Sequence, residues 1–175
     1  NVSMIFLPKL TPLLRRGEHE KTIVIDIEIF GREPRTPEIF RYENIHTIHI
    51  NMKQGIMDVC QFLLDSGKKR ISFVGGTNKD ASSNIRIAGF QNAIPEELQC
   101  GVYRSGFSMH WGYRAAQLMV KKDPLPDAVI CENDSLAAAI IKYMLTHGIS
   151  VPDDMWVIGF DNIPMAQMYN PSISS

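Results

Sequence analysis

Short apolar runs alternate along this chain with longer stretches in which apolar residues recur every three or four positions. Short runs are typical of buried strands, and the longer spacing is typical of helices. The runs predict strands over residues 2–7, 22–26, 45–50, 70–74, 100–103, 128–131 and 155–158. The spacing predicts helices over residues 52–66, 83–93, 108–121 and 134–146, and one helical turn over residues 165–169.

Three of the predicted helices have an apolar face that we expect to be buried. Ser108 precedes one helix and is expected to cap it, and Asp134, with Asn133 beside it, is expected to cap another. The faces are Ile56, Val59, Cys60 and Leu63; Trp111, Ala115 and Leu118; and Leu136, Ile140 and Met144.

The alternation of strands and helices with short connectors predicts an α/β fold, with a parallel sheet covered on both faces. The alternation is regular from residue 51 onward. The first fifty residues are less regular, and residues 31–40 are rich in proline and charge and predict a loop. We therefore place a domain boundary near residue 50.

Composition excludes several classes of protein. The net charge is −1, and the longest basic cluster is residues 68–70, so this chain by itself does not resemble a DNA-binding domain. Cys60, Cys100 and Cys131 form no CxxC pair, which argues against a disulfide framework or a zinc knuckle and favours a reducing, cytoplasmic setting. No apolar run is long enough to span a membrane.

Motifs for enzyme chemistry are absent from the sequence. It contains no phosphate-binding GxxxxGK[ST] loop, no dinucleotide-binding GxGxxG and no GxSxG nucleophile motif. The five histidines do not have metal-ligand spacing backed by carboxylates. We therefore expect a protein that is not an enzyme and that has no cofactor and no metal.

Polar residues follow several predicted strands where ligands bind in a doubly wound sheet, at the carboxyl ends. Asp26, Asn133 and Asp161 follow strands, Arg86 lies a turn into a helix, and Phe107 opens another. Carboxylates, an amide, a guanidinium and an aromatic ring suit a neutral polyol. Four of these residues also have a simpler interpretation. Asp26 could merely end a strand, and Asn133 could share a helix cap with Asp134. Arg86 could be a solvated charge, and Phe107 could belong to the core.

Two segments carry a more specific resemblance. They are LLDSGKKRISFVGGTNKDASSNIRIAGFQNAI at residues 63–94 and PDAVICENDSLAAAIIKYMLTHGISVPDDMWVIGFDNIPMAQMYNPSISS at residues 126–175. The segments contain four motifs: paired glycines followed by RxAGF, then PxAxxxxND, GIxVPxD and VxGFDN. In order and spacing, these motifs resemble the lactose-repressor (LacI/GalR) family of transcription regulators. Lys68 replaces the usual histidine of one turn, and HTIHINM lacks a frequent aspartate.

The resemblance implies a periplasmic-binding-protein-like fold: two doubly wound parallel-sheet subdomains with the ligand in the cleft between them. Residues 1–50 would be part of the N-terminal subdomain, residues 51–175 the C-terminal subdomain, and the helix-turn-helix domain would lie outside this sequence. The implied effector-binding residues are Asp26, Asp80, Ser82, Arg86, Phe107, Asn133, Ser135 and Asp161.

The resemblance also implies partners. The implied protein is a sugar-responsive regulator, a repressor, that binds a small carbohydrate. It would contact operator DNA through its N-terminal domain and form a homodimer or tetramer. An apolar face around Met165, Met168 and Tyr169 is the expected dimer interface; the alternative is that these side chains join the core of a monomer. Two other readings stay open: a periplasmic sugar-binding protein of a transporter, and a regulator that senses a purine.

Overall fold

The computed structural model describes residues 3–6, 22–27 and 45–175, with side chains described from Asn51 onward. The chain divides into two compact units, Asn1–Met52 and Lys53–Ser175. The first unit contains a parallel sheet of β1 (Ser3–Phe6), β2 (Thr22–Ile27) and β3 (Ile45–Ile50), in that order. The three strands predicted in this part are confirmed.

The second unit is built on a four-stranded parallel sheet in the order β5-β4-β6-β7. Its strands are β4 (Ile71–Gly75), β5 (Gln99–Arg104), β6 (Ala128–Cys131) and β7 (Trp156–Ile158). The chain moves from β4 outward to β5, and then returns to the other side of β4 to add β6. The strand order therefore reverses between β4 and β6, which makes a topological switch point there.

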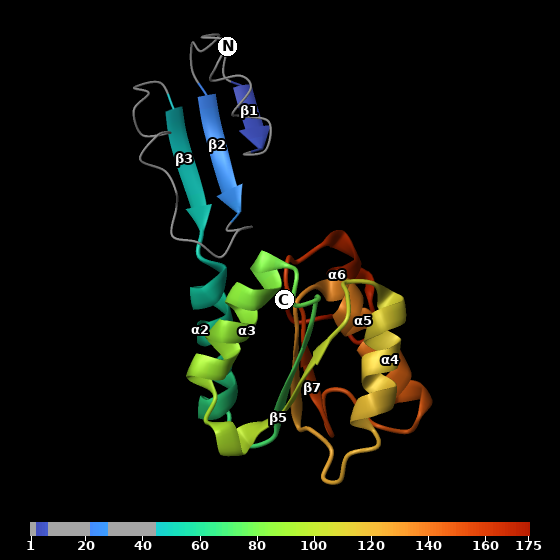
Figure 1. The fold of residues 1–175 in the computed structure, drawn as a ribbon. Helices are drawn as coiled ribbons and strands as arrows, with labels where there is room; N and C mark the ends of the chain where they lie inside the picture. The colour runs from blue at the N-terminus through green and yellow to red at the C-terminus, as the bar shows by residue number, and fades with distance from the viewer. Residues whose placement is uncertain (1–2, 7–21, 28–44) are drawn as a thin grey trace. The chain divides into compact units, whose positions relative to one another are not determined.

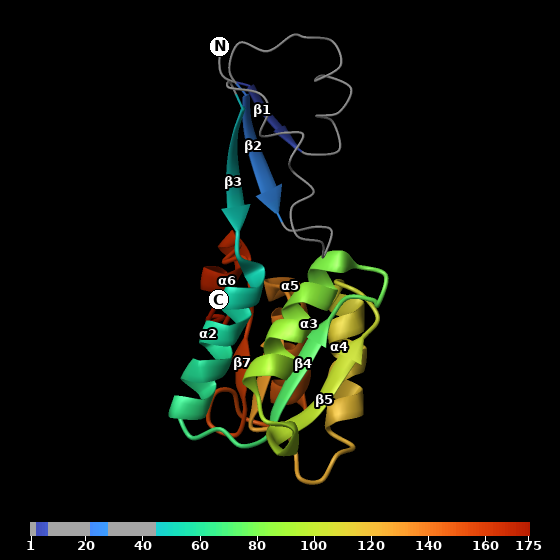
Figure 2. The same ribbon diagram turned by 60° about the vertical axis from the view of Figure 1, so that its left-hand side comes forward.

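Helices cover both faces of this sheet (Figures 1 and 2). On one face lie α2 (Met52–Asp65) and α3 (Ala81–Ala93), and on the other lie α4 (Met109–Met119) and α5 (Asp134–Thr146). Two short helices complete the unit, η2 (Glu96–Leu98) and α6 (Pro164–Met168). The predicted α/β architecture is confirmed, and each predicted helix lies within a few residues of its expected bounds.

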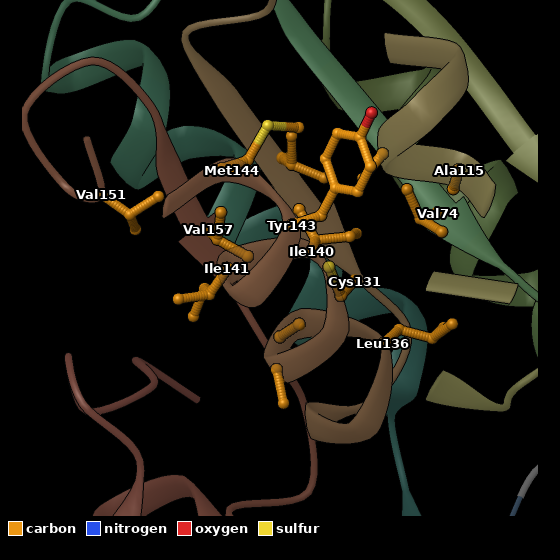
Figure 3. Packing of buried hydrophobic residues seen from close by; sticks show 14 of the residues in the cluster. Val74, Ala115, Cys131, Leu136, Ile140, Ile141, Tyr143, Met144, Val151 and Val157 are labelled. Atoms are coloured by element: carbon orange, nitrogen blue, oxygen red, sulfur yellow. The ribbon is translucent and has the colours of Figure 1, made fainter. Parts of the chain in front are cut away.

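Each face of the sheet has its own hydrophobic core. The core under α2 and α3 includes Ile56, Cys60, Leu63 and Phe90. The core under α4 and α5 is shown in Figure 3, where Leu136, Ile140 and Met144 of α5 pack toward Val74 and Cys131 of the sheet. Burial of apolar surface, which contributes about 25 cal/mol per Å², is the main force that holds the two helix layers on the sheet.

One expected face is wrong in α4. Leu118 is 43% exposed, whereas its neighbour Met119 is fully buried beside Ala115 and Ala116. The prediction assigned Leu118 to the buried face because it follows Trp111 and Ala115 at spacings of four and three. The buried face follows the closer packing of Gly112 and α5 instead, and it turns Leu118 to solvent.

The predicted cap of α4 is confirmed, whereas the predicted cap of α5 is displaced by one residue. The Ser108 hydroxyl accepts a hydrogen bond from the Trp111 amide at 3.3 Å, which confirms that cap. At α5 the cap is Asn133, not Asp134: the Asn133 backbone is extended and its Oδ1 accepts from the Leu136 amide at 2.8 Å. Asp134 is the first helical residue, and its carboxyl group turns away to a neighbouring loop.

In the described part of the chain, no helix is both long and apolar enough to cross a membrane.

Candidate functional site

Four loops meet at the carboxyl ends of the second sheet. Gly76 follows β4, Phe107 lies between β5 and α4, Glu132 follows β6, and residues 159–163 follow β7. The Glu132 amide donates to the Val74 carbonyl, so β4 and β6 stay paired to their ends. The switch point therefore brings the loop after β4 against the loop after β6, which is where α/β sheets bind ligands.

Arg86 projects from α3 into this edge and is 9% exposed. Its Nη1 donates to the Glu132 carbonyl oxygen and lies 3.7 Å from the Glu132 carboxylate. Its Nη2 lies 4.0 Å from Asp161 Oδ1, and the guanidinium covers the Phe160 ring at 4.2 Å. Burial lowers the pKa of Arg86, and the charges of Glu132 and Asp161 oppose that shift. The guanidinium is thus fixed in place before any ligand arrives.

Glu132 is fully buried beneath Arg86 and forms the centre of the site. Its Oε2 accepts from the Gly76 amide at 2.8 Å, and the Ser83 hydroxyl donates to its carboxylate at 2.7–2.8 Å. A Cβ at Gly75 would collide with this carboxylate. An unpaired buried carboxylate is costly, so these donors and the Arg86 charge stabilise Glu132 in its buried position.

The loop that carries Asp161 is held from below by Asp134. The Asp134 amide donates to the Phe160 carbonyl at 3.1 Å, and Asp134 Oδ2 accepts from the Ile163 amide at 2.8 Å. Between these anchors, Asp161 and Asn162 have positive φ angles of 96° and 46°. Such a backbone is uncommon for residues other than glycine and is found at sites where a side chain must be aimed.

Asp161 is the exposed acceptor of the site. Its side chain is 47% exposed, so it faces solvent on one side and Arg86 on the other. Burial raises the pKa of Asp161, Arg86 opposes that rise, and Asp134 adds to it. Arg86 and Asp161 are therefore two predicted residues that the fold does bring together.

Asn133 and Phe107 form the second pair. Asn133 Nδ2 donates to the Phe107 carbonyl at 3.1 Å while Oδ1 caps α5. Phe107 is 41% exposed, and its ring lies close over Gly76, where an added Cβ would meet both the ring and Ser83 Oγ. Phe107 is thus neither a core residue nor fully solvated. The amide of Asn133 keeps one hydrogen and one lone pair for a further partner.

The loop between β4 and α3 is braced by Arg104. Its Nη2 donates to the Thr77 carbonyl at 2.7 Å and to Asn84 Oδ1 at 2.6 Å. Asp80 Oδ2 accepts from the Thr77 amide at 2.7 Å and from its hydroxyl at 2.6 Å, and these bonds lower the pKa of Asp80. Asp80 therefore shapes the loop through Thr77.

The remaining predicted residues lie on or next to several different elements of the fold. Ser82 and Ser135 are half-buried in the first turns of α3 and α5. Asp26 lies in β2 opposite His49 of β3, and its side chain lies outside the described part of the chain. Of the expected dimer residues, Met165 and Tyr169 pack on the core, Tyr169 donates to the Ala138 carbonyl at 2.9 Å, and Met168 is 81% exposed.

Sequence reasoning missed the residues that hold the site together: Glu132, Ser83 and Phe160 make the contacts on which Arg86 depends. A signal for Glu132 existed, because it is the first polar residue after a wholly apolar strand. Ser83 lies three residues before Arg86, and therefore on the same face of α3. Phe160, next to Asp161, gave no signal beyond an aromatic residue at a strand end.

This arrangement is suited to holding a small polar molecule. It combines a fixed guanidinium, an exposed carboxylate, an amide and an aromatic face. Among residues with described side chains, no cluster of three or more histidine, cysteine or acidic groups could hold a metal. Burial raises the pKa of the Cys60 thiol to about 12, and raises that of Cys131 as well, so neither thiol is a ready nucleophile.

Comparison with known proteins defines the class. Residues 60–175 match the family of periplasmic binding protein-like domains, and the chain belongs to that family. The HTH-type transcriptional repressor PurR of Histophilus somni is 31% identical over 137 residues, 76% of this chain and 41% of the repressor. Catabolite control protein A of Priestia megaterium is 28% identical over 136 residues, 75% of this chain and 41% of that protein.

A solved structure agrees on the fold. A LacI family transcriptional regulator from Silicibacter pomeroyi superposes with a TM-score of 0.73 at 21% identity, over 94% of this chain and 67% of the regulator. The predicted resemblance to LacI/GalR regulators, and the periplasmic-binding-protein-like fold, are thereby confirmed. The chain spans about two-fifths of the length of these two relatives.

Proposed function

We propose that this chain is the effector-binding region of a cytoplasmic transcription regulator, and that its effector is a small neutral sugar. The observation that carries the proposal is the Arg86–Asp161 pair at the switch point, with the Asn133 amide and the Phe107 ring beside it. Guanidinium, carboxylate and amide groups bind vicinal hydroxyls, and an aromatic ring covers the apolar face of a pyranose. The similarity to the transcriptional repressor PurR supports a regulator over a transport protein.

The proposed mechanism is a coupling between two sites. A sugar held by Arg86, Asn133 and Asp161 would also be contacted from the other subdomain, with Asp26 as the expected acceptor. Binding would shift the equilibrium between two arrangements of the subdomains and change operator affinity, through a DNA-binding domain outside this sequence. Such couplings are typically about 1–3 kcal/mol, and they must be reciprocal.

Arg86→Lys provides the sharpest test of the site. Lysine keeps the positive charge above Glu132 but lacks the planar fork that holds two hydroxyl oxygens. We expect sugar affinity to fall by at least about tenfold, or 1.4 kcal/mol, with the folded state retained. Calorimetry with the sugar that gives the largest thermal shift in a screen is the measurement.

Arg114→Lys, on the exposed surface of α4, is the matched control for this substitution. It should leave the affinity unchanged. Equal sugar affinity in the wild type and in Arg86→Lys would contradict the proposal that Arg86 binds the sugar.

A purine effector is the second candidate, and the exposed Phe107 ring is the observation in its favour. A ring open on one side can stack on a base as well as on a sugar. A screen that includes free bases and nucleosides beside mono- and disaccharides separates the two, because only one class should raise the melting temperature.

A further inference from the structure

Arg86 shares its corner of the fold with three carboxyl groups. Glu132 lies 3.7 Å from one end of the guanidinium and Asp161 lies 4.0 Å from the other. Asp134, fully buried, is close enough to Asp161 to influence its pKa. Among the residues with described side chains, negative charge therefore exceeds positive charge around Arg86, and a ligand anion placed there would add to the excess. Charges interact strongly at such distances in a partly buried site.

The other cations described at this end of the sheet offer little compensation. Arg104 is bound to the Gly76 and Thr77 carbonyls and to Asn84. Lys53 and Lys79 are exposed, so water and salt screen their charges. The amino end of α5, where an anion could otherwise bind, already carries the Asn133 cap and Asp134.

We infer that Glu132 determines specificity by charge: it restricts the site to effectors without negative charge, and excludes the phosphate ester of the same effector. The inference rests on the proposed function, which places the effector against Arg86. Glu132 is a positioning residue here, because its contacts are with the protein and it acts on the ligand through Arg86.

A substitution at Glu132 can remove its charge while it keeps its hydrogen bonds. The Glu132 carboxylate is fully buried and is engaged by the Gly76 amide and the Ser83 hydroxyl, so it is not exposed to a ligand. In Glu132→Gln, the amide oxygen can take the place of Oε2 and accept from Gly76. The amide nitrogen then takes the place of Oε1 and donates to Ser83 Oγ. This substitution removes one negative charge and keeps the hydrogen bonds.

The experiment compares the wild type, Glu132→Gln and Glu97→Gln in the full chain. Glu97 is exposed on η2, at the opposite end of β5, and its substitution removes the same charge. The probes are neutral hexoses and pentoses, their phosphate esters, and inorganic phosphate, each titrated by calorimetry. We expect the wild type to bind a neutral sugar at least about tenfold more tightly than its ester. Glu132→Gln should reduce that ratio by about tenfold, and Glu97→Gln should leave it unchanged.

Each outcome decides the question. A wild type that binds the ester as tightly as the free sugar overturns the charge restriction and leaves the sugar site standing. If no sugar or ester binds, the sugar assignment fails, but the charge restriction can still be tested with inorganic phosphate. Glu132→Gln must then bind phosphate at least about tenfold more tightly than the wild type does. Should Glu132→Gln not fold, Asp161→Asn, at an exposed position, removes a charge from the same corner. No gain of ester or phosphate affinity in the variant that folds refutes the inference.

Discussion

At the residue scale, the carboxyl groups of this site have separate tasks that follow from their burial. Glu132 and Asp134 are fully buried and bind backbone amides of neighbouring loops, whereas Asp161 is half-exposed. Glu132 already accepts from Gly76 and Ser83 and has little to offer a ligand, whereas an exposed carboxylate beside a guanidinium has much. Sequence reasoning found Asp161 and overlooked Glu132, because burial is a property of the fold and a strand end alone does not reveal it.

The pH dependence of binding should report on Asp161. Burial raises its pKa in the free protein, so the carboxylate becomes protonated at a higher pH than an ordinary aspartate, for which the value is about 3.9. The ionised form accepts hydrogen bonds from hydroxyls, so affinity is full above the raised pKa and is lost as the pH falls through it. Calorimetry at decreasing pH should therefore show a loss of affinity that begins above the usual aspartate range.

Asp161→Asn provides the control for this pH profile. Because its amide does not titrate, the decline should flatten in the variant. A wild-type profile that stays level down to about pH 4 would contradict the assignment of Asp161 as an acceptor.

At the scale of elements, the positions of strands and helices were largely predictable, and their caps and faces only in part. Apolar runs and helical spacing are local properties, so β6 and α5 have the bounds expected for them. Leu118 was misplaced because the buried face of α4 is chosen by its contact with α5, which lies some twenty residues further along the chain. The cap of α5 was misassigned because two adjacent residues, Asn133 and Asp134, both favour that position.

Replacing the Ser108 cap tests how much α4 depends on it. The hydroxyl accepts from the Trp111 amide at 3.3 Å on an exposed surface, so Ser108→Ala should lower the free energy of unfolding by about 0.5–1 kcal/mol. Urea denaturation followed by circular dichroism measures this change. Ser105→Ala removes an exposed hydroxyl just outside the helix and should have a smaller effect. If both variants are equally stable, the Ser108 bond does not act as a cap in solution.

At the scale of the whole molecule, the second unit could be predicted best because its alternation is regular. The order β5-β4-β6-β7 locates the switch point, and the strand-end rule then locates Arg86 and Asp161. The contribution of Asp26 remains a prediction. The effector could not be read from the sequence, because the polar groups at these strand ends suit many small polar molecules.

The proposed dimer can be tested through Met168, which is 81% exposed at the end of α6. If this side chain is buried between two copies, Met168→Glu places a charge in an apolar contact and should weaken the dimer by at least about tenfold. Sedimentation of the full chain over a range of concentrations gives the association constant.

Gln91→Glu, on the exposed side of α3 across the sheet, is the control for the dimer test. It should leave association unchanged. A wild type that sediments as a monomer at every concentration would rule out the interface.

The loop after β7 has a consequence for how this site can change during evolution. Asp134 fixes the backbone of residues 159–163 from beneath, through the Phe160 carbonyl and the Ile163 amide. The side chain of Asp161 takes no part in those two bonds. Mutation can therefore exchange Asp161 for another residue that tolerates its positive φ without dismantling the loop. Descendants of one such chain can acquire new effectors through a few surface changes, while the buried carboxyl groups are inherited unaltered.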